Sequence, residues 1–343
     1  MLRFNDAEQL MELSVHDVVD AGPPSGHLNM SIGFAGRHRL AAGLAAHQAY
    51  QGHRESVDDA FSAEVTIRHR MLVRDWEVII HGRMDGLTQE GDHYVVEEVK
   101  SSALGYDRLE ALRPADLPDA EIQLQMYLHA LASQGKKAVG RLILISIVDG
   151  TQHVLHVGPY PGFEAFLERQ LVWMIERHER RLMWSARRRK TTVPFAHDDW
   201  RMGQEELALD VEEVVERGGH VLLAAPTGLG KTAGVLHGVL RSAYRTDRRI
   251  FFATARTTQQ RIVEDTVRQL SEAGLPIRAV SIRAREKACL NEVVACRPDC
   301  CPYANGHHDR VREASLTQQL WQEDKGVVRV PGPEDVVSVS AEN

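Results

Sequence analysis

Hydrophobic and polar positions follow a strand-like pattern in the first half of the chain. Residues 63–73, 76–84 and 93–101 are short runs, rich in β-branched residues and separated by turn-forming residues. This pattern predicts three strands in an antiparallel meander. Before them, the first sixty residues are expected to be largely helical, with a Gly/Pro break at 22–26 and an Ala-rich helix at 36–50 suited to close packing.

The spacing of apolar positions changes after the meander. It predicts a helix at about 119–133, strands at 141–148 and 153–157, and a long helix at about 162–188. The predicted order is therefore helix, three strands, helix, two strands. Residues 191–200 show no periodicity, and we expect them to form a linker to a second domain.

The second region begins with a different pattern. An apolar run followed by A-x-x-x-x-G-K-T occupies residues 221–232, which predicts a buried parallel strand, a phosphate-binding loop with Ala in place of the usual first Gly, and a helix. Gly228 and Gly230 let backbone N–H groups turn toward a phosphate. Lys231 would neutralise the β- and γ-phosphates, and the Thr232 hydroxyl would hold Mg²⁺. The alternative is a glycine-rich turn between a strand and a helix.

Composition narrows the class of protein. The 343 residues suit about two domains, and 43% hydrophobic with 26% charged residues is ordinary for a soluble globular chain. The apolar runs are too short to span a bilayer and the N-terminus lacks a signal-peptide pattern, so we expect a cytoplasmic protein. The net charge of −7 argues against general coating of polyanions. The basic run at 178–190 is typical of a solvated helix end or linker, with local nucleic-acid binding as the alternative.

All four cysteines lie close together in the sequence, at Cys289, Cys296, Cys300 and Cys301. A structural disulfide set would be spread more widely, and the cytoplasm would keep it reduced. The clustering therefore indicates a metal ion or an iron–sulfur cluster.

A second group of candidate residues lies in the meander. Asp85 is expected to end the second strand, and the third strand carries V-E-E-V-K at 96–100. Because side chains alternate along a strand, Glu98 and Lys100 share a face and Glu97 points away. Two carboxylates and a lysine at a sheet edge suit metal-assisted phosphodiester hydrolysis. The alternative is an ordinary surface Glu–Lys pair.

These residues resemble the PD-(D/E)XK nucleases of the RecB-like group. Asp85, then Glu98-x-Lys100, then Gln123 and Tyr127 on the following helix match that group's motifs in order and in type of element. The resemblance covers about residues 30–150. It implies that Asp85 and Glu98 bind Mg²⁺ or Mn²⁺, that Lys100 is catalytic, and that Gln123 and Tyr127 support the site or contact DNA.

The Ala-rich helix carries a further candidate, His47. This helix resembles the upstream helix of the same nuclease group, whose histidine can be an additional metal ligand. The alternative is a histidine that caps or packs the helix.

The second region resembles DNA helicases of superfamily 2, and its loop is similar to that of the XPD/DinG-like group. Gln204, upstream of the loop, resembles the adenine-reading element of that superfamily. The resemblance implies an ATP site at Gln204, Thr227, Gly228, Gly230, Lys231 and Thr232.

The next predicted strand, at 250–258, matches the following motif of these helicases. There the resemblance implies that Thr254, Arg256 and Thr257 hold the DNA backbone, a contact that positions a strand without reading its sequence. The alternative is a strand-to-helix turn with a capping threonine.

The cysteines fall where XPD/DinG-like helicases carry an iron–sulfur insertion. The resemblance implies that Cys289, Cys296 and Cys301 bind a 4Fe-4S cluster, whereas Cys300, directly beside Cys301, is expected to be a spare. Zinc is the alternative metal.

The resemblance to a helicase is incomplete. Residues 233–343 show neither the acidic Mg²⁺-binding strand nor the second RecA-like lobe that such a motor needs. Residues 326–343 resemble the segment just before the family's fourth cluster cysteine. The expectation is therefore an N-terminal fragment of a longer helicase.

Together these patterns predict an α/β protein with a restriction-endonuclease-like nuclease domain at 1–190. A partial P-loop RecA-like helicase lobe follows at 201–285, with the start of a cysteine-rich insertion at 286–343. The expected function is ATP-dependent DNA unwinding with metal-dependent DNA cleavage, in DNA repair or processing, on single-stranded or junction DNA and without a membrane. The alternatives are a non-catalytic DNA-binding module, a stand-alone nuclease, and a Cas-like or phage exonuclease with an unrelated ATPase.

Overall fold

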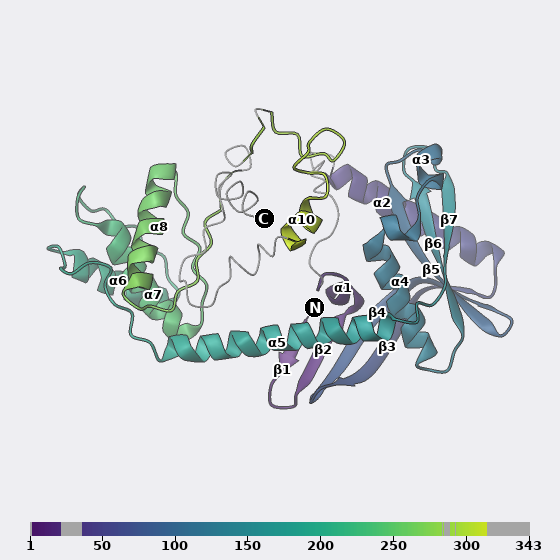
Figure 1. The fold of residues 1–343 in the computed structure, drawn as a ribbon, viewed down its shortest axis with the longest axis horizontal. Coiled ribbons are helices and arrows are strands. Elements are labelled where there is room, and N and C mark those ends of the chain that lie inside the picture. The colour runs from purple at the N-terminus through teal and green to yellow at the C-terminus, as the bar shows by residue number, and fades with distance from the viewer. Residues whose placement is uncertain (1, 22–35, 283, 285–288, 292, 314–343) are drawn as a thin grey trace. The chain divides into compact units, whose positions relative to one another are not determined.

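The computed structural model describes residues 2–21, 36–282, 284, 289–291 and 293–313 (Figure 1). The chain divides into two compact units, the first ending at Arg177 and the second continuing from His178. This division falls inside the long helix α5 (Phe163–Arg189), and the linker expected at 191–200 begins just after that helix. The domain limits derived from the sequence stay predictions.

A seven-stranded mixed sheet forms the centre of the first unit, in the order β1-β2-β4-β5-β6-β7, with β3 also paired to β4. The strands are β1 (Arg3–Asn5), β2 (Leu10–Ser14), β3 (Phe61–Val73), β4 (Trp76–Glu90), β5 (His93–Ser102), β6 (Ala138–Ser146) and β7 (Gln152–Val157). β3, β4 and β5 are antiparallel neighbours, which confirms the predicted meander. β5 and β6 are parallel, so a helix crosses over between them.

Helices flank this sheet. They are α1 (Val15–Val19), α2 (Gly36–Val57), α3 (Tyr106–Glu110), α4 (Pro118–Ala132) and α5, with a short 3-10 turn η1 at Pro114–Asp116. The predicted order of helix, three strands, helix, two strands and long helix is confirmed by α2, β3 to β5, α4, β6, β7 and α5.

The expectation of a largely helical N-terminus is wrong at its beginning, because β1, β2 and α1 precede α2. β2 pairs in parallel with β4 and buries Met11 and Leu13 on one face. Ser14 then accepts a hydrogen bond from the Asp17 backbone N–H and starts α1, which ends the strand after five residues. So short an alternating run is easily missed in a sequence. The Gly/Pro break at 22–26 lies outside the described residues.

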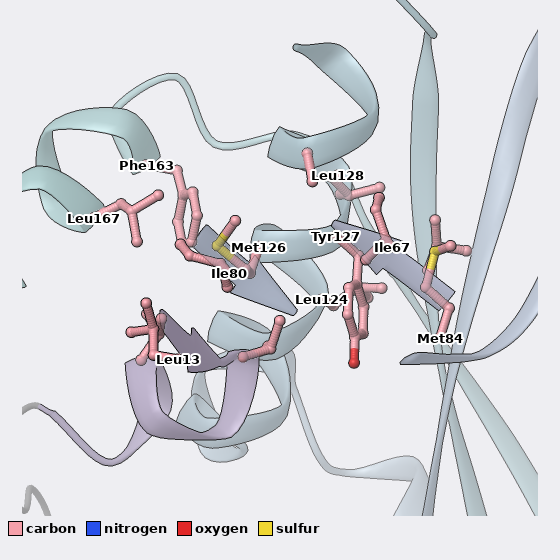
Figure 2. Packing of buried hydrophobic residues seen from close by; sticks show 14 of the residues in the cluster. Leu13, Ile67, Ile80, Met84, Leu124, Met126, Tyr127, Leu128, Phe163 and Leu167 are labelled. Atoms are coloured by element: carbon pink, nitrogen blue, oxygen red, sulfur yellow. The ribbon is translucent and has the colours of Figure 1, made fainter. Parts of the chain in front are cut away.

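The main core lies between one face of the sheet and helices α1, α4 and α5. Figure 2 shows Ile80 of the sheet, Met126 of α4, and Phe163 and Leu167 of α5 in this cluster. On the opposite face, Tyr50 of α2 packs with a smaller cluster that contains Val99, Ile143 and Ile145. Both faces of β5 and β6 are therefore covered, which explains the apolar run of β6 and the burial of Val95, Val96 and Val99 in β5.

The second unit contains α6 (Gln204–Arg217), α7 (Lys231–Thr246), α8 (Thr257–Glu272) and α10 (His307–Glu313). Its buried cluster includes Leu236 and Tyr244 of α7 and Val267 and Leu270 of α8. In neither unit do the described residues include a helix long and apolar enough to cross a membrane.

The two strands predicted in the second unit, at 221–225 and 250–258, are not formed. Residues 221–226 and 250–254 have no strand structure, and 257–258 already belong to α8. Leu222 is 99% exposed and Phe251 87% exposed. A strand is stable only when a neighbour takes up its backbone hydrogen bonds, and within the described part of this unit neither run has a paired strand.

Candidate active site

The sheet of the first unit forks at Asp85. Downstream of it, β4 pairs with β5 from Gly86 to Glu90, whereas further upstream β4 pairs with β2 instead. The Val99 backbone N–H donates a hydrogen bond to Asp85 Oδ2 at 2.8 Å, across the opening of the fork. The expectation that Asp85 ends its strand is wrong, because β4 continues to Glu90. What ends at this position is the pairing of β4 with β5.

Glu98 and Lys100 lie on β5 beside this fork. Lys100 Nζ donates to Glu98 Oε1 at 2.7 Å, so their side chains share a face as predicted. Glu97 points to the opposite face, toward Tyr50 of α2. The pair is no surface contact, because Glu98 is only 1% exposed.

Burial dominates the electrostatics of Glu98. It raises the pKa of this carboxyl to about 7, and the Asp85 charge also raises it, whereas Lys100 lowers it. The second oxygen, Oε2, is buried and has no hydrogen-bond partner among the described residues. A buried carboxylate oxygen without a partner is costly. A positive group placed between Asp85 and Glu98 would lower this cost and favour the ionised carboxylate.

Helix α4 supports Lys100 from the other side. Gln123 Oε1 accepts from Lys100 Nζ at 3.1 Å, and Gln123 Nε2 donates to the Tyr127 hydroxyl at 3.2 Å. The Tyr127 hydroxyl donates to the Arg83 carbonyl at 2.8 Å, two residues before Asp85. Burial raises the pKa of Tyr127 to about 12, so the hydroxyl stays protonated as this donation requires. Lys100 is thus held by a chain of hydrogen bonds that starts at β4.

Close packing against Tyr127 explains why residue 82 of β4 is a glycine. A Cβ on Gly82 would lie 2.7 Å from Cε1 of Tyr127 and 2.8 Å from Cγ2 of Val15. Figure 2 shows the Tyr127 ring near Leu124 with its hydroxyl pointing out of the hydrophobic cluster. The absence of a side chain at Gly82 therefore lets the Tyr127 ring pack closely against β4.

Helix α2 brings His47 to Asp85. His47 Nδ1 lies 3.9 Å from Asp85 Oδ2, beyond hydrogen-bond distance. Burial lowers the pKa of His47 and Asp85 opposes this effect, so the ring is favoured in the neutral form that binds metals. One turn further along, Gln51 Nε2 donates to the Asp85 carbonyl at 2.9 Å. Sequence reasoning missed Gln51, although its spacing of four from His47 places both on one helix face.

The donor set suits a hard divalent cation, which prefers carboxylate oxygens. Asp85 and Glu98 are the two carboxylates, and the free Oε2 of Glu98 is a donor without a protein partner. Within the described residues, however, no three side chains of His, Cys, Asp or Glu are already grouped as metal ligands. The fork is therefore a two-carboxylate site with a histidine next to it.

In the second unit, the predicted phosphate-binding loop has left-handed glycines. Gly228 and Gly230 have φ angles of 88° and 79°, and α7 begins directly afterwards at Lys231. Gln204 Nε2 donates to the Gly230 carbonyl at 2.9 Å, which ties α6 to the loop. Lys231 Nζ donates to the carbonyls of Ala225 and Pro226, at 2.9 and 2.8 Å.

The remaining ATP-site candidates lie on the same segment. Thr227 is exposed in the loop, and Thr232 is half-buried in the first turn of α7. The residues expected to hold the DNA backbone surround the start of α8. Thr254 is half-buried, Arg256 is the residue before the helix, and Thr257 is its first residue. Their roles stay predictions.

The four cysteines do not form a grouped metal site among the described residues. Cys301 is buried and accepts a hydrogen bond from Asn291 Nδ2 at 3.3 Å, whereas Cys300 is exposed. Cys289 and Cys296 are half-buried. The cluster expected at Cys289, Cys296 and Cys301 stays a prediction.

The first unit is a mixed α/β fold with helices on both faces of a central sheet. No family model matches the sequence, and no curated protein matches it. Among solved structures, SSO0001 is similar over 48% of this chain and 75% of its own, at 18% identity and a TM-score of 0.33. An alkaline exonuclease (LHK-Exo) from Laribacter hongkongensis is similar over 51% of this chain and 92% of its own, at 13% identity and a TM-score of 0.33. Both TM-scores are too low for either likeness to assign a function.

Proposed function

We propose that the first unit is a metal-dependent DNA nuclease of the RecB-like PD-(D/E)XK type. The observation that supports this most directly is the meeting of Asp85, Glu98 and Lys100 at the fork between β4 and β5. A structural ion pair would not need the chain of hydrogen bonds that runs from Lys100 through Gln123 and Tyr127 to β4.

Each residue has a role that follows from its surroundings. Asp85 and Glu98 would hold Mg²⁺ or Mn²⁺, with His47 as a further ligand. When bound, such a cation lowers the pKa of water and neutralises charge on a phosphate. Lys100 is 35% exposed and carries donors that can orient water or a phosphate oxygen. Gln123 directs Lys100, and Tyr127 fixes Gln123.

The test is cleavage of labelled single-stranded, double-stranded and junction DNA by the full chain, with Mg²⁺ or Mn²⁺. Asp85→Asn and Lys100→Met should each lower the cleavage rate by a factor of about 10² or more. A factor of about 10² is the lower end of the rate loss seen when a group that stabilises transition-state charge is removed. The matched control is Lys137→Met, an exposed lysine of the same unit that pairs with Asp92. Absence of wild-type cleavage with both metals would favour the non-catalytic DNA-binding module.

The second unit is proposed to bind ATP, as in XPD/DinG-like helicases that act in DNA repair or processing. The left-handed glycines before α7 and the contact of Gln204 with Gly230 support this. When ATP binds, Lys231 Nζ would donate hydrogen bonds to phosphate oxygens in place of the Ala225 and Pro226 carbonyls. Fluorescent ATP should bind the wild type and lose affinity in Lys231→Ala, with Lys190→Ala as the control. Equal affinity of wild type and Lys231→Ala would leave the first unit as a stand-alone nuclease.

The cysteines are proposed to bind a 4Fe-4S cluster through Cys289, Cys296 and Cys301. Their clustering in the sequence and the resemblance to the iron–sulfur insertion of XPD/DinG-like helicases support this. Anaerobically purified protein should contain iron and sulfide, and Cys301→Ser should lose both, whereas Cys300→Ser should not. Stoichiometric zinc without iron would overturn the proposal in favour of the zinc alternative.

A further inference from the structure

Helix α2 presents a polar stripe to the sheet, where an apolar stripe is usual. Four polar side chains at spacings of three and four face the sheet beside Ala46, namely His47, Tyr50, Gln51 and Arg54. His47 and Gln51 contact Asp85, and Tyr50 and Arg54 contact Glu97. One helix face therefore connects the candidate active site to a second polar centre on β5.

This second centre is built around Glu97, the neighbour of Glu98 on the opposite face of β5. Glu97 is 1% exposed, and the Tyr50 hydroxyl donates to its Oε2 at 2.8 Å. Arg54 Nη2 lies 3.4 Å from Glu97 Oε1, and Arg141 Nη1 of β6 lies 3.7 Å from the same oxygen. The Arg54 guanidinium also lies over the Phe61 ring, 4.9 Å from its centre.

Stability alone does not account for this network. Burying charged groups has a large desolvation cost, and packed apolar residues in their place are often as stable or more stable. Buried polar groups are best attested as devices that fix register. Here the element whose register they fix is α2, because the network joins Tyr50 and Arg54 of that helix to Glu97 of the sheet.

The register of α2 determines where His47 lies. Tyr50 and Arg54 follow His47 by three and seven residues, so they lie on the same side of the helix. A slide of α2 by one residue would move His47 by about 1.5 Å along the helix axis. That distance would separate its ring from Asp85, now 3.9 Å away. Gln51 Nε2 also holds the sheet, at the Asp85 carbonyl of β4 and at Glu64 Oε1 of β3, but the Glu64 contact is on an exposed side chain and the buried anchor of the helix is Glu97.

We infer that Tyr50, Arg54 and Glu97 are positioning residues that fix the register of α2 and thereby hold His47 at the divalent-cation site with Asp85. The inference rests on the proposed nuclease function for the presence of that cation. The two adjacent carboxylates of β5 then have different roles. Glu98 faces the cation, and Glu97 faces the helix that carries the third ligand.

The test is a double-mutant cycle on Mn²⁺ affinity, measured by calorimetry on the full chain without DNA. Tyr50→Phe and Glu97→Gln should each weaken Mn²⁺ binding by about tenfold, the lower end of what supporting residues contribute at metal sites. In a His47→Ala background, the same changes should alter the affinity less than twofold, because the ligand they position is gone. Tyr94→Phe, a half-buried tyrosine on the same strand, is the matched control.

The outcomes separate the two proposals. If the wild type does not bind Mn²⁺, both the metal role of the fork and this inference are wrong. If the wild type binds Mn²⁺ but Tyr50→Phe weakens it equally with and without His47, only the inference is wrong. If Glu97→Gln does not fold, Tyr50→Phe still tests the inference, because it keeps the aromatic ring and removes only the hydroxyl. An unchanged near-ultraviolet circular dichroism spectrum of Tyr50→Phe would show that this variant retains the fold.

Discussion

Glu97 and Glu98 are adjacent in the sequence and lie on opposite faces of β5, because a strand alternates its side chains. The shared face of Glu98 and Lys100 could therefore be predicted from spacing alone, and the ion pair at 2.7 Å confirms it. The contact of Gln51 with Asp85 could not, since it depends on how α2 lies on the sheet. Spacing determines which residues share a face, but not what that face contacts.

The Tyr127 hydroxyl is the residue-scale feature that is easiest to remove alone. Tyr127→Phe removes the hydroxyl that donates to the Arg83 carbonyl. It also leaves Gln123 Nε2 without the acceptor that the hydroxyl provides. We expect the free energy of unfolding to fall by about 1–3 kcal/mol, the usual cost of a buried group left unpaired. Urea unfolding measures this, with Tyr94→Phe as the control, and a change below about 0.5 kcal/mol, typical of a neutral surface substitution, would contradict it.

A pair of neighbouring histidines, one buried and one half-buried, gives the first unit a pH dependence. His69 and His129 lie with ring centres 5.1 Å apart. Burial lowers the pKa of both, and the charge of His129 lowers that of His69 further. Below about pH 6.5 the unfolded histidines take up protons that the folded ones do not. Their contribution to the free energy of unfolding is therefore constant above that pH and becomes less favourable as the pH falls below it.

The measurement is urea unfolding between pH 8 and 5 for wild type and the double variant His69→Gln/His129→Gln. The variant should lose less stability on acidification. Glu98 contributes with the opposite sign, since its folded pKa is raised, but both proteins contain it. Parallel curves for the two proteins would contradict the assignment.

At the scale of elements, the same apolar pattern gave a correct prediction in one unit and a wrong one in the other. The strands β3, β4 and β5 follow one another and pair as a meander, so each has its partner close in sequence. The apolar runs at 221–225 and 250–258 would need partners from elsewhere in the chain. Local pattern shows that a segment suits a strand, but pairing decides whether a strand forms.

Helix α7 packs on α6 through two glycines, Gly234 and Gly238, of which Gly238 makes the closer approach. A Cβ on Gly238 of α7 would lie 2.2 Å from the Ala208 carbonyl oxygen of α6. Since a backbone atom cannot move aside cheaply, Gly238→Ala should destabilise this unit by about 1–3 kcal/mol through overpacking. The control is Gly52→Ala in α2, where a Cβ meets nothing within 4 Å, and a gain of about 0.5–1 kcal/mol is expected. Equal effects of the two changes on chemical unfolding would contradict this packing.

At the scale of the whole molecule, the two units have separate cores and separate candidate chemistry. From α2 to α5 the order of elements followed from periodicity, and the candidate site was predicted from residue types at fixed spacings together with the resemblance to RecB-like nucleases. The fork at Asp85 could not be predicted in this way, because it arises where β2 replaces β5 as the neighbour of β4. A change of strand partner depends on distant segments and leaves no local pattern.

The loop of the second unit is expected to bind ATP without hydrolysing it at the rate of a helicase. Rapid hydrolysis also needs a carboxylate that positions water and a cation opposite the γ-phosphate, and an arginine there is worth about 10³–10⁵ in rate. Residues 233–343 contain no Asp-Glu-x-His motif to supply the carboxylate. Phosphate release with single-stranded DNA should equal that of Lys231→Ala. Rapid release that Lys231→Ala abolishes would reveal a catalytic acid in this segment.

The central claim is that the fork between β4 and β5 cleaves DNA with a divalent cation. The most direct measurement is the rate at which the full chain, stripped of metal with EDTA, cleaves labelled DNA before and after addition of Mn²⁺. The wild type should be inactive before the addition and active after it, and Glu98→Gln should stay inactive throughout. Cleavage that persists in EDTA, or that Glu98→Gln retains at the wild-type rate, would contradict the account.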